Sequence, residues 1–164
     1  MAIESFGHKK GMIRDMKIVI ASEHAGFELK EIIKKHLIQA AEEVIDVGVT
    51  SSVPVDYPPI AENAAVRVAS GEYDLGILIC GTGTGMCISA SKVTGIRPAL
   101  CTNEFMAEMA RRHNDANILC LGSWVTGSRL SMSIVDAFIK NSFDGERHAV
   151  RVDLIKEIEL RQRD

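Results

Sequence analysis

The residues of this chain best suited to chemistry lie in the run Cys80-Gly81-Thr82-Gly83-Thr84-Gly85. The apolar run 75–79 before it predicts a buried strand, and a helical pattern covers residues 86–92 after it. A loop with glycine at every second position points backbone N–H groups and a helix N-terminus at one spot, which suits a phosphate or a developing oxyanion. Such a field also favours a thiolate, so Cys80 is a candidate base or nucleophile.

Other interpretations of this loop stay open. Cys80 can be a small buried apolar residue before a turn that binds nothing, and Thr82 can cap that turn instead of donating a hydrogen bond to a substrate. The position six residues after the cysteine is Met86, whereas a tyrosine phosphatase needs arginine there. The run also lacks the Gly-Lys-Ser/Thr ending of a P-loop and the Gly-x-Gly-x-x-Gly spacing of a dinucleotide site.

Two histidines lie in polar clusters elsewhere in the chain. His24 follows Glu23 at a predicted strand-to-helix turn, where the carboxylate can orient and charge the imidazole; a solvated or capping histidine is the alternative. His113 and Asn114 suit acid–base chemistry on a hydroxyl group. They equally suit a helix C-terminus, at which His113 complements the helix dipole and Asn114 takes a left-handed cap.

Two arginines and one tyrosine complete the set of candidates. Arg147 and Arg151 are four residues apart, so a helix places both on one face, where they can clamp a phosphate. The alternative for this pair is an exposed basic face. Tyr57 precedes two prolines at a turn into a predicted helix, and it either lines a pocket or packs.

Composition narrows the class of protein. The chain has 164 residues, of which 46% are hydrophobic, and no apolar run approaches the roughly 18 residues of a membrane span. A net charge of −3 gives no electrostatic reason to expect nucleic acid as a partner. The four cysteines lack the spacing of a metal site or a secreted disulfide framework, so we expect reduced thiols in a cytoplasmic protein. We expect residues 1–15 to be a disordered extension or the result of an upstream start, and residues 16–164 to be a single domain.

Short apolar runs alternate with helical patterns along the chain. Strands are expected at residues 17–21, 43–47, 75–79, 97–101 and 118–121, and helices at 27–39, 59–70, 86–92, 104–112, 127–141 and 150–160. This alternation predicts an α/β fold: a three-layer, doubly wound sandwich around a five-stranded parallel sheet, Rossmann-like or flavodoxin-like. Ligands bind at the carboxyl ends of the strands in such sheets. We therefore expect the clusters around His24, Cys80 and His113 to converge at one edge.

Taken together, these segments resemble the type B ribose-5-phosphate isomerase family, which includes the galactose-6-phosphate isomerase subunits. The resemblance covers residues 16–158 and rests on the motifs Glu23-His24-Ala25-Gly26-Phe27, Asp56-Tyr57-Pro58, Cys80-Gly81-Thr82-Gly83, Gly95-Ile96-Arg97, His113-Asn114-Asp115-Ala116-Asn117 and Gly145-Glu146-Arg147-His148. It implies a homodimer or dimer-based tetramer with active sites at the subunit interface. It also implies an aldose–ketose isomerase without metal or cofactor, which interconverts ribose 5-phosphate and ribulose 5-phosphate through an enediolate in the pentose phosphate pathway.

The same resemblance implies a role for each candidate residue. Cys80 is the base that moves a proton between C2 and C1, Thr82 helps to stabilise the enediolate, and His113 assists ring opening. The residues implied in substrate binding are Glu23, His24, Tyr57, Gly81, Gly83, Gly85, Asn114, Arg147 and Arg151.

The chain departs from the family pattern at three positions. Glu23 replaces a usual aspartate, Trp124 replaces an arginine that contacts phosphate in some members, and Glu146 replaces a common glycine. These departures leave open an isomerase of a six-carbon sugar phosphate, galactose 6-phosphate or allose 6-phosphate, and a sugar-phosphate-binding protein without activity. A flavin-binding protein is a weaker alternative, because aromatic residues make up only 5% of the chain and no Ser/Thr-rich loop follows the first strand.

Overall fold

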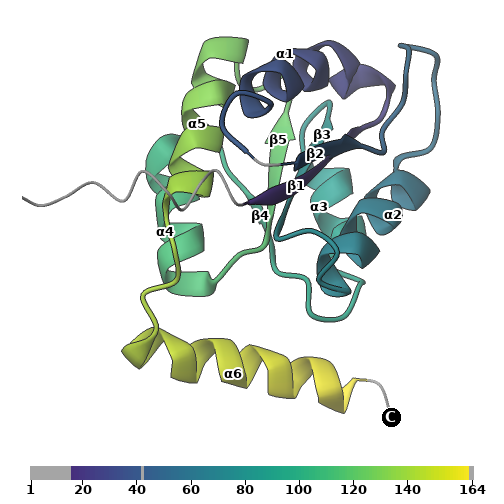
Figure 1. Cartoon of the computed structure of the whole chain (residues 1–164). Helices are drawn as coiled ribbons and strands as arrows, with labels where there is room; N and C mark the ends of the chain where they lie inside the picture. The colour runs from purple at the N-terminus through teal and green to yellow at the C-terminus, as the bar shows by residue number, and fades with distance from the viewer. Residues whose placement is uncertain (1–15, 42, 163–164) are drawn as a thin grey trace, which may run out of the picture.

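The computed structural model describes residues 16–41 and 43–162, and Figure 1 shows a central sheet with helices on both faces. In this part of the chain, five parallel strands form the sheet: β1 Lys17–Ser22, β2 Glu43–Asp46, β3 Leu75–Cys80, β4 Pro98–Leu100 and β5 Ile118–Gly122. Their order is β2-β1-β3-β5-β4, which exchanges the last two strands of the flavodoxin order. The expected doubly wound α/β fold is confirmed, whereas the expected extension 1–15 lies outside the described residues.

Helices cover both faces of the sheet. Helices α1 (Phe27–Leu37), α4 (Glu104–Asn114) and α5 (Ser128–Lys140) pack on one face, and α2 (Tyr57–Ala69) and α3 (Thr84–Ala90) pack on the other. A strand that is covered on both sides needs apolar side chains at successive positions. Strand β3 meets this requirement, because each of its residues is buried.

The connection before β2 crosses one face of the sheet, and the connection after β2 crosses the other face. This change of face places a topological switch point between the neighbouring strands β1 and β3. Ser22 is paired with Ile79, and Cys80 is paired with Gly122, so β1, β3 and β5 end at the same edge of the sheet. A short 3-10 turn, η1 (His24–Gly26), follows β1 at this edge. In sheets of this type the crevice at the switch point is where ligands bind.

Three helices begin earlier than their sequence patterns indicate. Helix α2 begins at Tyr57, two residues before the expected start. Helix α3 begins at Thr84, directly after Gly83, which has a left-handed φ of 80°. The last helix, α6 (Glu146–Arg161), begins four residues before the expected start. Both Arg147 and Arg151 are therefore helical, as a shared face requires.

Helix α6 stands apart from the sandwich (Figure 1). Its Glu159 carboxylate accepts a hydrogen bond of 2.9 Å from the Gly95 N–H, and a cleft of about 780 Å³ lies between the helix and the sandwich. Within the described ranges, none of the helices is long and apolar enough to cross a membrane.

Candidate active site

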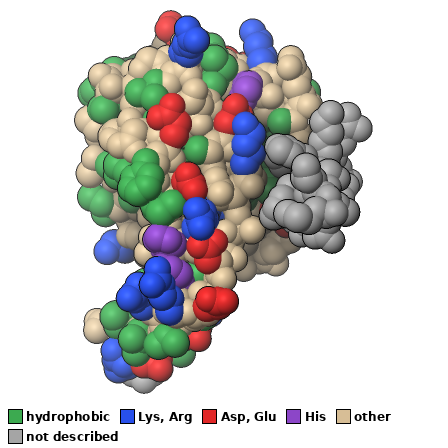
Figure 2. Space-filling model, turned by 90° about the vertical axis from the view of Figure 1, so that its left-hand side faces the viewer, with side chains coloured by type: hydrophobic (Ala, Val, Ile, Leu, Met, Phe, Trp, Pro, Cys, Tyr) green, Lys and Arg blue, Asp and Glu red, His purple; other side chains and the backbone are tan. Residues whose placement is uncertain are grey.

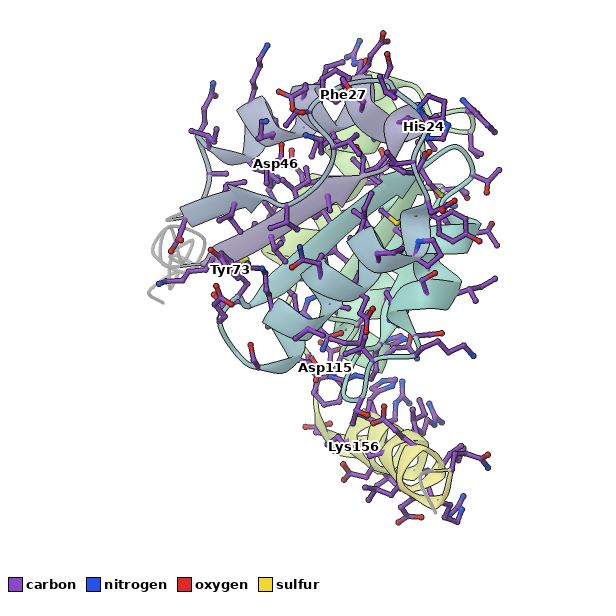
Figure 3. All side chains as sticks on the ribbon, turned by 90° about the vertical axis from the view of Figure 1, so that its right-hand side faces the viewer. His24, Phe27, Asp46, Tyr73, Asp115 and Lys156 are labelled. Atoms are coloured by element: carbon purple, nitrogen blue, oxygen red, sulfur yellow. The ribbon has the colours of Figure 1, made fainter. Side chains whose placement is uncertain are left out.

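The candidate residues form two separate groups. The thiol site consists of Glu23, His24, Tyr57, Cys80 and the loop 81–85, and the basic site consists of His113, Asn114, Arg147, His148 and Arg151. In Figure 3, His24 lies at one end of the sandwich, whereas Asp115 lies at the other end, next to α6 with its Lys156.

The expectation that His113 joins Cys80 at one edge of the sheet is wrong within a single chain. Helix α4 ends at Asn114, directly before β5 begins, and a helix that leads into a parallel strand delivers its last turn to the amino end of that strand. The Asn117 carbonyl accepts a hydrogen bond of 2.9 Å from the N–H of Gly76 near the start of β3. Cys80 terminates the same strand at the opposite edge.

Cys80 is held by the glycine loop that follows it. Its side chain is buried, and its Sγ accepts a hydrogen bond of 3.1 Å from the Gly83 N–H. A Cβ at Gly83 would lie 2.5 Å from Leu100 Cδ1 and 2.9 Å from the Leu121 backbone, in addition to the left-handed strain. Glycine is thus required at position 83, where its backbone N–H points at the Cys80 sulfur.

Thr82 lies at the exposed tip of the loop. Its Oγ1 accepts a hydrogen bond of 3.4 Å from the Thr84 N–H, which agrees with the capping interpretation. An acceptor role leaves the hydroxyl proton available for a ligand oxygen. Both roles proposed from the sequence are therefore compatible with one conformation.

Two aromatic rings flank the loop. A Cβ at Gly85 would lie 2.8 Å from the Tyr57 ring, and a Cβ at Gly81 would lie 2.6 Å from the Trp124 ring. Trp124 is 75% exposed, and its backbone N–H donates to the Gly81 carbonyl at 2.9 Å. The sequence marked Trp124 only as a departure from the family pattern. Its contact with Gly81 comes from two strand ends that are far apart in sequence.

His24 is oriented by the carboxylate beside it. Glu23 is buried, accepts a hydrogen bond of 3.1 Å from the Ala25 N–H, and lies 2.6 Å from His24 Nδ1 through its other oxygen. The Val55 N–H also points at Nδ1, at 3.3 Å, but one ring nitrogen cannot donate to Glu23 and accept from Val55 at once. The shorter contact with a carboxylate is the stronger one, so Nδ1 carries a proton and Nε2 is left to face a ligand.

A buried ion pair supports the neighbouring loop. The Lys30 side chain is fully buried in α1 and contacts Asp46 at the end of β2, which also accepts from Lys34 at 2.7 Å. Burial alone would raise the pKa of Asp46, but the hydrogen bonds from Lys30 and Lys34 outweigh it and hold that pKa below its ordinary value. The ionised Asp46 accepts from the Gly48 N–H at 3.0 Å, at the start of the loop that leads to Val55 and Tyr57.

At the basic site, α4 ends differently from the sequence expectation. Asp115, rather than Asn114, takes the left-handed conformation, with a φ of 47°. The Asp115 carboxylate is held by Arg97 at 2.7 Å, so it is a structural partner. Asn114 remains the last helical residue and lines the cleft under α6.

His148 joins the basic site although the sequence did not single it out as a site residue. Its buried ring stacks on the His113 ring, with centroids 4.1 Å apart and an angle of 5° between planes. Burial lowers the pKa of His148, and the positive charges of His113, Arg147 and Arg151 lower it further. Figure 2 shows histidine side chains beside Lys and Arg side chains where the lower lobe meets the rest of the molecule. The spacing of 113 and 148 carries no signal of this contact.

The basic site is better suited to an anion than to a metal ion. Among the described residues, His113, Asp144 and His148 offer ligand atoms within 4.8 Å of one another. However, stacked parallel imidazoles do not aim their nitrogens at one point. Asp144 is already paired with Arg112 at 3.2 Å, and Arg147 Nε lies 3.4 Å from His148 Nε2. The surplus of positive charge suits a phosphate group.

Comparison with known proteins gives one consistent result. The family described as Ribose/Galactose Isomerase matches residues 18–155. Ribose-5-phosphate isomerase B of Escherichia coli is 47% identical over 89% of this chain and 98% of that protein. The structure of ribose-5-phosphate isomerase B from Clostridium thermocellum is 51% identical over 90% of this chain and 99% of that chain, with a TM-score of 0.87. The enzyme of Mycoplasma genitalium with bound ribulose 5-phosphate is 43% identical over 89% and 97% of the two chains, with a TM-score of 0.83.

Proposed function

Because this chain belongs to the Ribose/Galactose Isomerase family and is an aldose–ketose isomerase of sugar phosphates, we propose that it interconverts ribose 5-phosphate and ribulose 5-phosphate. The observation that carries this proposal is the buried Cys80 Sγ, 3.1 Å from the Gly83 N–H. Isomerisation needs one base that takes a proton from one carbon and returns it to the next. A cysteine sulfur that accepts a hydrogen bond from a backbone N–H is placed to carry out both steps.

In this reaction Cys80 takes the proton from C2 of the open-chain sugar and returns it to C1, through an enediolate. The backbone N–H groups of the loop 81–85, which include those of Gly81, Gly83 and Gly85, stabilise the enediolate oxygen together with the Thr82 hydroxyl. Loss of one such donor typically costs about 3 kcal/mol of barrier. No step in this scheme requires a metal ion.

The remaining residues bind and open the sugar. His113, with Asn114 beside it, assists ring opening. His24, Arg147 and Arg151 hold the phosphate, and Glu23 and Tyr57 shape the sugar end of the pocket. His24 and the two arginines lie at opposite ends of one chain, so these roles require a second chain.

We infer that the basic site of one protomer completes the thiol site of another, in a homodimer or a dimer-based tetramer. Helix α6 supports this inference, because it stands apart from its own sandwich and carries exposed apolar side chains at Val150, Leu154, Ile155, Ile158 and Leu160. Exposed apolar patches of this kind mark surfaces that a partner covers. In this assembly we propose that residues 16–164 act as one isomerase domain.

The decisive experiment measures ribulose 5-phosphate formation from ribose 5-phosphate in the presence of a chelator. Wild type is expected to turn over, and Cys80→Ala is expected to lose about 10²–10⁴-fold in rate, the usual contribution of a general base. Cys101→Ala is the matched control, because it removes a buried thiol on the opposite face of the sheet. Turnover of galactose 6-phosphate or allose 6-phosphate, but not of ribose 5-phosphate, would overturn the assignment of substrate.

A further inference from the structure

In an inference that rests on the proposed function, we propose that Trp124 contacts the carbon skeleton of the bound sugar and so selects a sugar phosphate over free phosphate. Its side chain has the largest exposed fraction, 75%, of the large hydrophobic side chains in the described part of the chain. Exposure of a single apolar residue is common on protein surfaces. This indole, however, lies against Gly81, the residue that follows the proposed base.

The segment that carries Trp124 is fixed to two neighbouring elements. The Ser123 backbone N–H donates to the Cys80 carbonyl at 2.9 Å, and the Ser123 hydroxyl donates to the Ala25 carbonyl in η1 at 2.8 Å. The Trp124 backbone N–H donates to the Gly81 carbonyl, also at 2.9 Å. These bonds hold the backbone under the indole before any ligand arrives, so binding against the ring costs less ordering entropy than binding against a mobile loop.

The indole and the Tyr57 ring form apolar walls at the two ends of the glycine loop. A Cβ at Gly81 would lie 2.6 Å from Cε3 and from Cζ3 of Trp124, so the six-membered half of the indole covers this glycine. The Tyr57 ring covers Gly85 in the same way at the other end and is 41% exposed. Small-molecule sites commonly combine apolar and aromatic walls with a few polar groups of this kind.

The chemistry of an indole decides which part of the ligand Trp124 can bind. An indole carries no positive charge, so it cannot form the charge-assisted pair with a phosphate that an arginine forms. The negative face of its ring attracts the positively polarised hydrogens on carbon, which line the apolar side of a sugar. Trp124 therefore adds affinity for the carbon skeleton, and the phosphate is left to His24, Arg147 and Arg151 of the proposed function.

Fluorescence gives a direct test, because Trp124 is the only tryptophan in the chain. Wild type is titrated with ribose 5-phosphate and, separately, with inorganic phosphate. Ribose 5-phosphate is expected to shift the emission to shorter wavelengths and to shield the indole from acrylamide, whereas inorganic phosphate leaves both unchanged. No response to a sugar phosphate that the protein turns over would overturn the proposal. An indole already shielded without ligand would also overturn it, because a partner chain would then cover the ring.

Kinetics of variants provide the second test. Trp124→Ala is expected to raise KM for ribose 5-phosphate about 3- to 10-fold with kcat nearly unchanged, because it removes a contact made equally in the ground state and the transition state. The inhibition constant of inorganic phosphate is expected to stay at its wild-type value. Trp124→Phe keeps an aromatic ring and most of the affinity. Ile38→Ala is the matched control, since Ile38 is 61% exposed at the end of α1, at the opposite edge of the sheet.

Two kinetic results would contradict the contact. A fall in kcat at unchanged KM would make Trp124 a positioning residue for the loop 81–85. Equal weakening of ribose 5-phosphate and inorganic phosphate would place its effect on the phosphate. Should Trp124→Ala not fold, the fluorescence of wild type decides.

Failure of this inference can be told apart from failure of the proposed function. If wild type does not turn over ribose 5-phosphate, the proposed substrate is wrong. The titration is therefore also run with galactose 6-phosphate and allose 6-phosphate, and the sugar phosphate that is turned over decides the role of Trp124. Turnover of ribose 5-phosphate without a fluorescence response would overturn the role of Trp124 and leave the proposed function intact.

Discussion

The thiol site and the basic site differ in the kinds of chemical group that form them. The thiol site uses a buried cysteine and backbone N–H groups at the end of β3, with positions set by the register of the sheet. The basic site uses long side chains at the end of α4 and the start of α6, and both Arg147 and Arg151 are exposed. Proton transfer requires that the reacting atoms are held to within fractions of an ångström. A phosphate, in contrast, can be bound by long, flexible, charged side chains.

Each site alone lacks what the other supplies. The thiol site offers a base and donors for an enediolate, but its one basic side chain is His24. The basic site offers a concentration of positive charge without a group placed to move a carbon-bound proton. We therefore expect activity to require that the thiol site of one chain lies beside the basic site of another chain.

Subunit complementation gives the largest effect. Cys80→Ala and the double variant Arg147→Ala/Arg151→Ala are each expected to lose about 10²–10⁴-fold in kcat/KM, through loss of the base or of two charged hydrogen bonds. After joint unfolding and refolding, a random mixture of the two is expected to regain about a quarter of wild-type activity, because half of the dimers carry one intact site. Each variant refolded alone serves as the control. Two affinity tags verify that mixed dimers have formed. If these mixed dimers remain inactive, both sites must lie in one chain.

Alanine substitutions at two glycines can separate the cost of backbone strain from the cost of a steric clash. Gly83 lies in the thiol site, and Gly95 lies outside it. Gly83 and Gly95 have almost the same φ, 80° and 79°, but a Cβ meets Leu100 and Leu121 at Gly83 and nothing within 4 Å at Gly95. Gly95→Ala is expected to lose about 1–2 kcal/mol of unfolding free energy, from strain alone. Gly83→Ala is expected to lose a further 1–3 kcal/mol or so from overpacking. Urea unfolding at one protein concentration measures both, and equal losses would contradict the tight contact at Gly83.

The smallest expected effect is the contribution of His148, in the basic site, to the pH dependence of the free energy of unfolding. Burial and neighbouring positive charges lower the pKa of His148 in the folded protein from its ordinary value of 6.5. Just below pH 6.5, His148 therefore binds a proton more readily in the unfolded chain than in the folded protein. The free energy of unfolding therefore falls as the pH drops below about 6.5, and this contribution is absent above that pH. Wild type should lose more stability between pH 7.5 and 5.5 than His148→Gln does, by urea unfolding. Identical losses in the two proteins would place His148 in an ordinary solvated environment.

The local patterns of the sequence predicted most of the fold. The apolar runs and helical periods gave the five strands and the main helices, because these signals come from residues near one another in the chain. Helix ends were less predictable. The start of α3 depends on how Gly83 fits against Leu100 and Leu121, and the start of α6 lies at an exposed turn around Gly145. Contacts that close over long separations left no local signal, as with Trp124 on Gly81 and His148 on His113.

The sequence by itself determined the chemistry: a cysteine before a glycine loop, a histidine beside a carboxylate, and two arginines four residues apart. Residue types and short spacings carry that information, since each motif is read within one element. The tertiary structure alone decided where these groups meet. Strand order and strand direction are properties of the whole sheet, and they send Cys80 and His113 to opposite edges. The same non-local packing stacks the His148 ring on the His113 ring, although 35 positions separate them along the chain.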